Sequence, residues 1–265
     1  MDGITKKVAI VTGATAGIGL ATAKILTKKG WTVYGTGRRN FDSDDFRYVC
    51  LDVNDSDGMK NFLQTVFDEH GRIDLVVNNA GFGIAGAIED ATVENIKAIT
   101  DTNLVAVAVT CKHAIPFLKP TKGKIINVSS IGGLIPLPYQ AMYSATKSAV
   151  EVFSRALATE VKPFGMTVTA VLPGDTKTDF GKARVTDSNP DSGNQQKMQR
   201  FVGKMERDEN NGVSPDVVAK AICKAAEKKR SPLRVCIGFG GKTIAFLTRF
   251  LSVKTINSTV NKIYK

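Results

Sequence analysis

Short apolar runs alternate with longer amphipathic segments over the first 240 residues of the chain. The runs have the length of β-strands and are rich in Val and Ile, which is typical of parallel strands buried on both faces. This alternation predicts an α/β fold with a doubly wound parallel sheet of seven strands and helices on both faces. The expected strands are residues 8–12, 32–36, 48–51, 73–78, 124–129, 166–172 and 234–237.

The segments between these strands predict five helices, and one domain accommodates them all. A chain of 265 residues stays within what one hydrophobic core supports, so we expect a single domain over residues 1–265. Residues 175–212 are polar and break the alternation, which predicts a mobile substrate lid, with a disordered surface loop as the alternative. Residues 241–265 are expected to form a basic, amphipathic C-terminal extension. The expected helices are residues 17–29, 55–70, 92–118, 141–161 and 214–228.

A glycine-rich turn joins the first expected strand to the first expected helix. Gly13 permits a sharp turn, Gly17 lets the backbone approach a pyrophosphate, and Gly19 allows the helix to pack closely on the sheet. The N-terminus of the helix then faces the phosphates, where its free N–H groups favour an anion. The turn therefore predicts a Rossmann-type dinucleotide site that includes Gly13, Thr15, Ala16, Gly17, Ile18 and Gly19.

Two arginines at the end of the second expected strand indicate which dinucleotide binds. An acidic residue at this place would bind the ribose 2′-hydroxyl of NAD(H), whereas a basic residue would bind a 2′-phosphate. Arg38, with Arg39 as the second candidate, therefore favours NADP(H) over NAD(H). Asp52 and Val53 follow the third expected strand and are expected near the adenine.

A tyrosine and a lysine on one helix are the candidate catalytic pair. Tyr143 and Lys147 are four residues apart and share a helix face, a spacing that is common by chance. Ser130 adds context because it ends a strand at the carboxyl edge of the sheet, where open α/β folds bind ligands. Reduction of a carbonyl by NADPH needs a proton donor at the oxygen, and Tyr143 can supply that proton.

The expected chemistry requires a change in the acidity of Tyr143. A free tyrosine has a pKa of about 10, too high for a group poised near neutrality. The Lys147 ammonium and the positive charge of an oxidised nicotinamide would both favour the phenolate and lower the pKa of Tyr143. Tyr143 would then act as an acid in reduction and as a base in oxidation.

The chain resembles the classical short-chain dehydrogenase/reductase family over residues 6 to 240. The motifs occur in family order and at family spacing. They are residues 12–19, Asn78-Asn79-Ala80-Gly81, Asn103, Asn127-Val128-Ser129-Ser130, Tyr143 to Lys147, and Pro173-Gly174 followed by Thr178. The resemblance implies a Rossmann fold, NAD(P)-dependent oxidoreductase activity on CH–OH groups, and a homodimer or homotetramer.

The resemblance also implies roles for individual residues. Lys147 would hold the nicotinamide ribose, Ser130 would hydrogen-bond the substrate oxygen, and Asn103 would support a water relay to Lys147. Ser129 is the rival for the serine role, and the thirteen-residue interval between Ser130 and Tyr143 favours Ser130. Asn79, Ala80 and Gly81 would lie beside the cofactor, and Pro173, Gly174, Thr176 and Thr178 would meet the nicotinamide carboxamide or the pyrophosphate.

The substrate pocket is expected in the segments that these motifs do not fix. Its candidate residues are mostly apolar, which favours a hydrophobic ketone or secondary alcohol such as a steroid, a retinoid or a lipid. The candidates are Phe82, Ile84, Leu134, Ile135, Leu137, Pro138, Tyr139, Met142 and the lid from Phe180 onward.

The positive charge of the chain is concentrated near its C-terminus. The formal net charge is +11, and the residues from Lys220 to Lys265 contribute eleven bases against the single acid Glu227. Apolar residues at helical spacing lie among the bases of the last 25 residues. We expect this stripe to pack against the body or a second subunit, with contact to a membrane surface as the alternative.

Other classes of protein are disfavoured. No run reaches the roughly 18 apolar residues of a membrane-spanning helix, and the N-terminus lacks a signal peptide, so a cytoplasmic location is expected. Four scattered Cys and two isolated His indicate no metal site, and no motif indicates nucleic-acid binding. A non-catalytic dinucleotide-binding sensor or scaffold remains the alternative function, although such a protein would not need Ser130, Tyr143 and Lys147.

Overall fold

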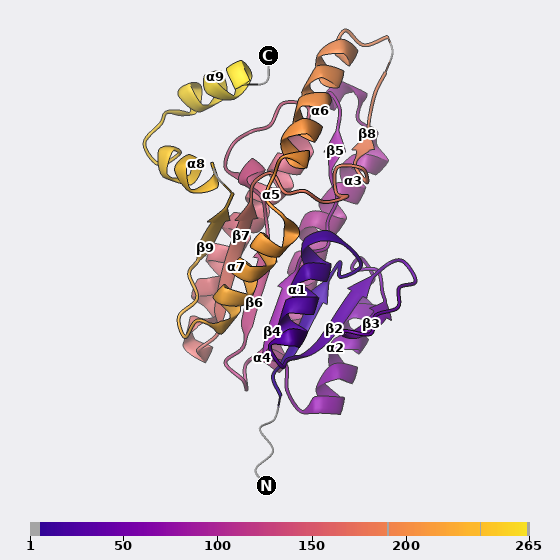
Figure 1. Ribbon diagram of the computed structural model, residues 1–265, viewed down its shortest axis with the longest axis vertical. Helices are drawn as coiled ribbons and strands as arrows, with labels where there is room; N and C mark the ends of the chain where they lie inside the picture. Colours follow the sequence, from indigo (N-terminus) through magenta and orange to yellow (C-terminus); the bar gives the residue numbers. More distant parts are fainter. Residues whose placement is uncertain (1–5, 190, 239, 264–265) are drawn as a thin grey trace.

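A computed structural model describes residues 6–189, 191–238 and 240–263, with a seven-stranded parallel sheet at the centre (Figure 1). The order of the strands is β3-β2-β1-β4-β6-β7-β9. This confirms the predicted doubly wound sheet. The strands are β1 (Val8–Thr12), β2 (Thr32–Gly37), β3 (Arg47–Cys50), β4 (Leu75–Asn78), β6 (Lys124–Val128), β7 (Thr167–Pro173) and β9 (Arg234–Ile237).

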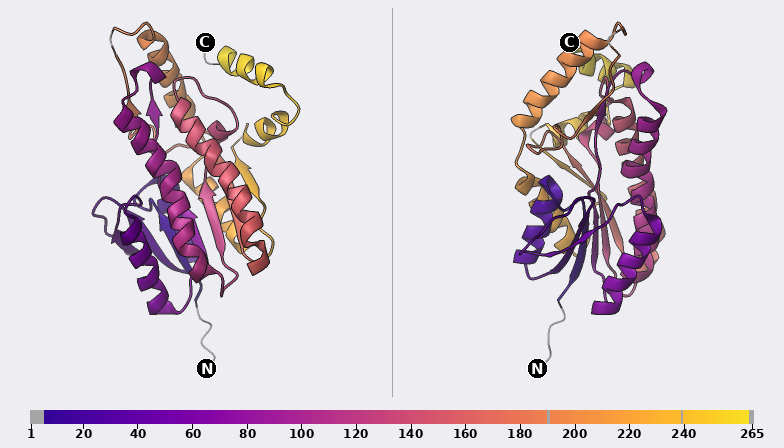
Figure 2. Two further views of the ribbon diagram at one scale, coloured as in Figure 1. Left: turned by 180° about the vertical axis from the view of Figure 1, so that it is seen from behind. Right: turned by 90° about the vertical axis from the view of Figure 1, so that its right-hand side faces the viewer.

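Helices cover both faces of the sheet, as the right-hand view of Figure 2 shows. One face is covered by α1 (Gly17–Lys28) and α7 (Pro215–Glu227), and the other by α2 (Ser56–His70), α4 (Ala106–Leu118) and α5 (Ala141–Val161). Successive strand residues enter opposite cores: Ile10 packs in the core that contains the α2 and α4 side chains, and Val11 in the core with α1 and α7. Because side chains alternate along a strand, a sheet covered on both faces requires continuous apolar runs.

The order of the strands reverses between β1 and β4, since β2 lies on one side of β1 and β4 on the other. Chains that leave the sheet here turn to opposite faces and open a crevice at the carboxyl ends of the strands. The glycine-rich turn follows β1 at this point. The topology therefore places the predicted dinucleotide site where the fold provides space for it.

The expected continuous helix over residues 92–118 is interrupted in the structure. It consists of α3 (Val93–Thr100), a π-helical turn η2 (Asp101–Val105) and α4. A π-helical turn contains one residue more than an α-helical turn, and such turns are frequent at functional sites. The turn includes Asn103, whose side chain is fully buried.

The polar stretch 175–212 contains a helix that its composition did not predict. Helix α6 (Gln195–Asn210) buries Met198, Phe201 and Met205, which lie on one helical face. A strand from the same stretch, β8 (Val185–Thr186), pairs with β5 (Ile84–Ala85) beside the main sheet. Besides η2, the described residues contain the short helical turns η1 (Ile88–Asp90), η3 (Ile131–Gly133) and η4 (Lys162–Phe164).

Two helices form the C-terminal extension and stand beside the body in Figures 1 and 2. They are α8 (Gly241–Leu247) and α9 (Val253–Ile263), and the last two residues of the expected extension lie outside the described residues. The N-terminal segment interpreted above also lies partly outside them, because the description begins at residue 6. No helix in the described part of the chain is long and apolar enough to cross a membrane.

Candidate active site

A cavity of about 1300 Å³ lies at the carboxyl edge of the sheet. It brings together residues from the carboxyl ends of the strands of the main sheet and from the loops that follow them. All the predicted dinucleotide-binding residues except Gly19 line it, namely Gly13, Thr15, Ala16, Gly17, Ile18, Arg38, Arg39, Asp52, Val53, Asn79, Ala80, Gly81, Tyr143, Lys147, Pro173, Gly174, Thr176 and Thr178.

The glycine turn has the conformation that its sequence predicted. Gly13 and Gly17 have φ angles of 67° and 53°, in the left-handed region that favours glycine. A Cβ added at Gly19 would lie 2.1 Å from the Gly13 carbonyl oxygen, so Gly19 contacts the turn directly and lies beneath the cavity. The three glycines together hold the end of β1 against the start of α1.

The turn is fixed from the neighbouring strand by polar side chains. The Thr12 hydroxyl accepts hydrogen bonds from the backbone N–H groups of Asn79 and Ala80, each at 3.0 Å. The Asn79 side-chain amide donates to the carbonyl oxygens of Thr12 at 3.0 Å and Gly13 at 3.2 Å. These bonds couple the ends of β1 and β4 and keep the cavity floor in one conformation.

The first turn of α1 is suited to an anion. Ala16 precedes the helix and provides no side-chain hydrogen bond to it, and the first turn contains no acidic residue. The N–H groups at this end therefore lack a side-chain acceptor, and the cavity lies against them at Ala16, Gly17 and Ile18. This cradle fits the pyrophosphate of a dinucleotide.

Arg38 and Arg39 are exposed at the end of the cavity that β2 forms. Neither guanidinium forms an ion pair with a described residue. The Tyr48 hydroxyl donates to the Arg39 carbonyl oxygen at 2.5 Å and anchors the backbone there. Both cationic groups are therefore free to bind a phosphate.

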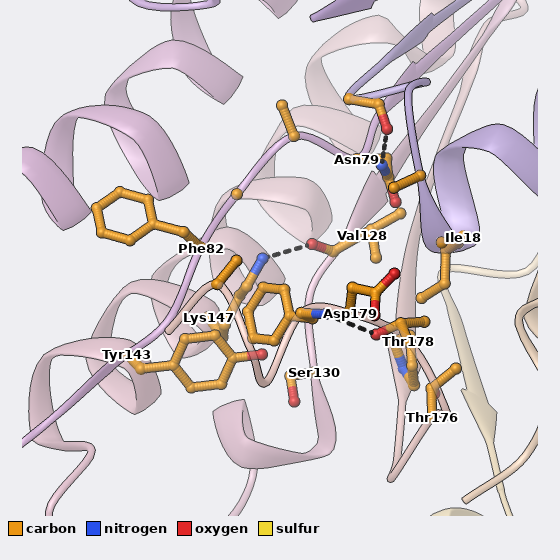
Figure 3. A pocket seen from close by; sticks show the side chains of 18 of the residues that line it. Ile18, Asn79, Phe82, Val128, Ser130, Tyr143, Lys147, Thr176, Thr178 and Asp179 are labelled. Carbon is orange, nitrogen blue, oxygen red and sulfur yellow. Dashed lines mark hydrogen bonds between the residues drawn. The ribbon is translucent and has the colours of Figure 1, made fainter. Parts of the chain in front are cut away.

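Tyr143, Ser130 and Lys147 meet at the other end of the cavity (Figure 3). Helix α5 presents Tyr143 and Lys147 on one face, with the Lys147 Nζ 5.9 Å from the centre of the Tyr143 ring. That Nζ donates to the Val128 carbonyl oxygen at 3.0 Å. The Tyr143 hydroxyl points toward Ser130, which follows β6.

The two serines of the motif have different partners. The Ser129 hydroxyl is buried and donates to the Lys147 carbonyl oxygen at 2.6 Å. The Ser130 Oγ accepts from the Gly132 N–H at 3.0 Å, which leaves its own proton for a hydrogen bond at Tyr143. The geometry thus favours Ser130 over Ser129 for the role beside the tyrosine.

Burial decides the acidity of both members of the pair. It raises the pKa of Tyr143 above its ordinary value, and the hydrogen bond with Ser130 opposes that rise. Burial lowers the pKa of Lys147 from 10.5 to about 8. The expected lowering of the Tyr143 pKa is therefore not reproduced by the protein's own groups, because burial has the largest effect on it and Lys147 is not among the groups that lower it.

Asn103 does not line the cavity but hydrogen-bonds the backbone of Phe82, a residue that does. Its side-chain oxygen accepts from the Phe82 N–H at 3.0 Å, and its amide donates to the Phe82 carbonyl oxygen at 2.9 Å. A Cβ added at Gly81 would lie 2.9 Å from the Asn103 Oδ1 and 3.4 Å from the Lys147 Nζ, so the π-helical turn lies directly beside the lysine.

Part of the expected substrate pocket lines the cavity and part does not. Phe82, Ile135, Leu137 and Phe180 line it, and the Phe180 ring centre lies 5.9 Å from that of Tyr143. The expected residues Ile84, Leu134, Pro138, Tyr139 and Met142 are not among its lining residues. Tyr139, for example, packs against Phe201 of α6 instead, with ring centres 5.8 Å apart.

Four further residues complete the wall, two of them within the expected lid. Ile131 of η3, Met205 and Glu209 of α6, and Ile244 of α8 all line the cavity. Glu209 is paired with Arg184, whose side chain is only 2% exposed. A sequence signal exists for Met205, because Met198, Phe201 and Met205 have helical spacing.

Comparison with known proteins agrees with this geometry. The short chain dehydrogenase family model matches residues 7–189. The chain is 40% identical over 238 residues to a 3-ketodihydrosphingosine reductase of Bacteroides thetaiotaomicron, covering 88% of each chain. The crystal structure of a short-chain dehydrogenase from Streptomyces avermitilis superposes with a TM-score of 0.81 at 31% identity and covers 97% of this chain and 95% of that one.

An alcohol dehydrogenase from Thermococcus sibiricus, solved with 5-hydroxy-NADP, superposes with a TM-score of 0.71 at 25% identity, covering 88% of this chain and 96% of that one. The family match covers more than half of the chain, and the site contains the groups that hydride transfer requires. The chain therefore belongs to the short-chain dehydrogenase family and is an NAD(P)-dependent oxidoreductase that acts on CH–OH and carbonyl groups.

Proposed function

We propose that the protein uses NADPH to reduce the ketone of a long-chain, lipid-like substrate. The observation that supports the reaction best is the meeting of Tyr143, Ser130 and Lys147 in one cavity with the glycine cradle. Bound NADPH supplies a hydride to the carbonyl carbon. Every other requirement of the reaction falls on the side chains of the cavity.

Ser130 and Tyr143 act at the substrate oxygen in this proposal. Ser130 donates a hydrogen bond to that oxygen, and Tyr143 transfers its hydroxyl proton to it as the negative charge develops. The raised pKa of Tyr143 keeps the hydroxyl protonated before the transfer. The Lys147 ammonium then stabilises the phenolate, and Asn103 supports a water relay that returns a proton through Lys147.

The remaining residues hold the dinucleotide. The turn from Gly13 to Gly19 would bind the pyrophosphate, Asp52 and Val53 would lie near the adenine, and Lys147 would also bind the nicotinamide ribose. Asn79, Ala80 and Gly81 would line one side of the cofactor. Pro173, Gly174, Thr176 and Thr178 would meet the carboxamide or the pyrophosphate.

The preference for NADP(H) rests on Arg38 and, second, on Arg39. Unpaired guanidinium groups at this end of the cavity match the geometry of a 2′-phosphate. Arg38→Asp should weaken the binding of NADPH at least tenfold more than that of NADH, with Arg39→Asp as the matched variant. Fluorescence titration of each nucleotide measures this, and an equal loss for both nucleotides would overturn the assignment.

The proposed substrate class rests on the cavity wall and on the name of the relative from Bacteroides. Apolar side chains from the loop after β4, from the η3 region, from the expected lid and from α8 fit an alkyl chain. Arg184 pairs with the Oε1 atom of Glu209, and the Oε2 atom of Glu209 would accept a hydrogen bond from an ammonium group. A long-chain amino ketone such as 3-ketodihydrosphingosine has both features. The wall side chains are Phe82, Ile131, Ile135, Leu137, Phe180, Met205 and Ile244.

A panel of ketones with NADPH oxidation as readout tests the substrate class. We expect the highest kcat/KM for the long-chain amino ketone, a lower value for the same chain without the amine, and the lowest for a steroid or retinoid ketone. Tyr143→Phe should abolish turnover of every member. Higher activity on the steroid than on the amino ketone would reject the lipid-like class while leaving the reaction itself intact.

We also propose that the protein forms a homodimer or homotetramer. Helices α4 and α5 lie together on one face of the molecule, where Val152 of α5 is 57% exposed and Val105, directly before α4, is 46% exposed. Sedimentation equilibrium of the wild type measures the state. A monomer at micromolar concentration would contradict this proposal.

Finally, we propose that the C-terminal extension contacts a membrane surface from outside. Ile244 packs on the body, whereas other apolar side chains of the extension do not, and Phe250 is 73% exposed. Exposed aromatic residues beside lysines and arginines are typical of segments that lie in a lipid interface.

A further inference from the structure

Several exposed apolar side chains of the C-terminal extension lie close together in the sequence. We define the tail patch as Phe246, Leu247, Phe250, Leu251 and Val253, all of which are exposed. Val253 is 74% exposed, and the rings of Phe246 and Phe250 lie 5.1 Å apart. Monomeric soluble proteins rarely leave such a group uncovered, so the tail patch indicates an interaction surface.

Positive charge surrounds the tail patch. Lys242, Arg249, Lys254 and Lys262 are exposed, and residues 241–263 contain no acidic residue. None of these four bases forms an ion pair with a described residue. A partner that fits this surface must therefore combine apolar groups with negative charge.

The opposite side of the same helix belongs to the cavity. Ile244 lines the cavity, and a Cβ added at Gly241 would lie 3.3 Å from the Ile131 side chain. Ile131 follows Ser130 directly in η3. Helix α8 therefore separates the tail patch from the cavity wall by the thickness of one helix, because Ile244 and Phe246 point in nearly opposite directions on it.

The positive charge around the tail patch indicates whether a second copy of the chain or a bilayer covers it. In a two-fold symmetric interface the tail patch would meet itself, and its four bases would face four more. An anionic bilayer instead accepts the aromatic side chains below its headgroups and attracts each base. The observed combination fits the bilayer.

From these contacts we infer that the tail patch binds an anionic bilayer while the opposite side of α8 forms part of the cavity wall. The substrate would then pass from the bilayer into the cavity beside α8 without entering the surrounding water. This inference rests on the proposed function, because only a lipid-like substrate would gain from such a route. In this inference the tail patch and the cavity face of α8 act together in the entry of the substrate.

Vesicle co-sedimentation tests the membrane contact. The probes are vesicles of phosphatidylcholine alone and vesicles with 30% phosphatidylglycerol, each incubated with the full chain in 0.1 M salt. The test variant is F246S/F250S, and the matched control is V217S, which removes an exposed apolar residue from α7. Wild type and control should bind the anionic vesicles at least tenfold better than the double variant and the neutral vesicles.

Two enzyme assays test the route. The double variant should reduce a long-chain ketone presented in anionic vesicles at least tenfold more slowly than the wild type, and a water-soluble short-chain ketone at the same rate. Equal rates for both proteins on the vesicle substrate would overturn the inference, as would unchanged binding of the double variant to vesicles. So would a dimer that the double substitution converts to a monomer, because a second copy would then cover the tail patch.

The assays also separate this inference from the proposed function. If the wild type reduces neither ketone, the proposed function fails, while the sedimentation experiment still decides whether the tail patch binds lipid. If the wild type reduces both ketones but does not sediment with anionic vesicles, the function holds and the inference is rejected.

Discussion

Ketone reduction should decline as the pH rises through about 8, because Lys147 loses its proton there. Burial lowers the pKa of this side chain from 10.5 to about 8, and its ammonium donates to the Val128 carbonyl oxygen at 3.0 Å. The neutral amine would no longer stabilise the phenolate that Tyr143 leaves behind. For a single titrating group, kcat/KM should fall to about half at pH 8 and about a tenth at pH 9.

The same pKa shift predicts an effect on stability with the opposite sense. A lysine whose pKa is lower in the folded state binds fewer protons there than in the unfolded chain between pH 8 and 10.5. The free energy of unfolding should therefore rise with pH in that window. The shift corresponds to about 3 kcal/mol, an order-of-magnitude value for this one group.

Steady-state rates with saturating NADPH between pH 6 and 10 measure the decline in activity, and urea unfolding at pH 7 and pH 10 measures the stability. Lys147→Met is the reference for both, because it keeps a similar length without a titrating group. Its residual activity should show no decline at pH 8. The reasoning fails if the wild type keeps its full rate to pH 9.5, or if the variant shows the same decline.

Two further substitutions test the architecture around the site. Gly19→Ala should weaken NADPH binding about a hundredfold, because its Cβ would lie 2.1 Å from a backbone oxygen of the cradle. Gly193→Ala is the matched control and should leave the affinity unchanged, because a Cβ there would meet nothing within 4 Å. A titration that finds equal affinities for the two variants would contradict this. Glu151→Ala should lower the free energy of unfolding by about 3 kcal/mol, because it leaves Arg234 without the buried carboxylate that accepts its hydrogen bonds at 2.5 and 2.9 Å. Urea unfolding measures that loss, and a change below about 0.5 kcal/mol, as surface substitutions give, would refute it.

The sheet could be predicted because its physical signal is local. Strands buried on both faces must be continuously apolar, and β1 and β4 show this directly in their sequences. The site residues of the motifs could be predicted for a related reason. The carboxyl ends of parallel strands meet at one edge, so the glycine turn, Ser130 and Arg38 converge although they are far apart in the chain.

The interruption of the helix over residues 92–118 had no such signal. The residues of the π-helical turn are compatible with an α-helix, and the hydrogen bonds of Asn103 to the Phe82 backbone form only in the folded chain. The acidity of Tyr143 was equally hidden. Spacing shows that Lys147 is near, but the extent of burial that raises the tyrosine pKa depends on the whole fold.

The substrate end of the cavity depends on tertiary placement. Glu209 and its partner Arg184 lie in a polar stretch whose helical signal is limited to three apolar residues, and Ile244 belongs to an extension that follows the last strand. The break in the alternation predicts that residues 175–212 cover the cavity, but no local pattern shows which of their side chains line it or that Ile244 returns to it. The same reasoning explains why the expected pocket residues Pro138 and Met142 do not line it.

The central claim is that the hydroxyl of Tyr143 delivers a proton to the substrate oxygen, and its most direct test is the rate of NADPH oxidation by Tyr143→Phe with a long-chain ketone at pH 7. Tyr139→Phe is the matched control, since Tyr139 lies four residues earlier and does not line the cavity. The account predicts a loss of about a thousandfold for the first variant, with NADPH affinity unchanged, and near wild-type rates for the second. A Tyr143→Phe protein that keeps its rate within tenfold of the wild type would contradict it.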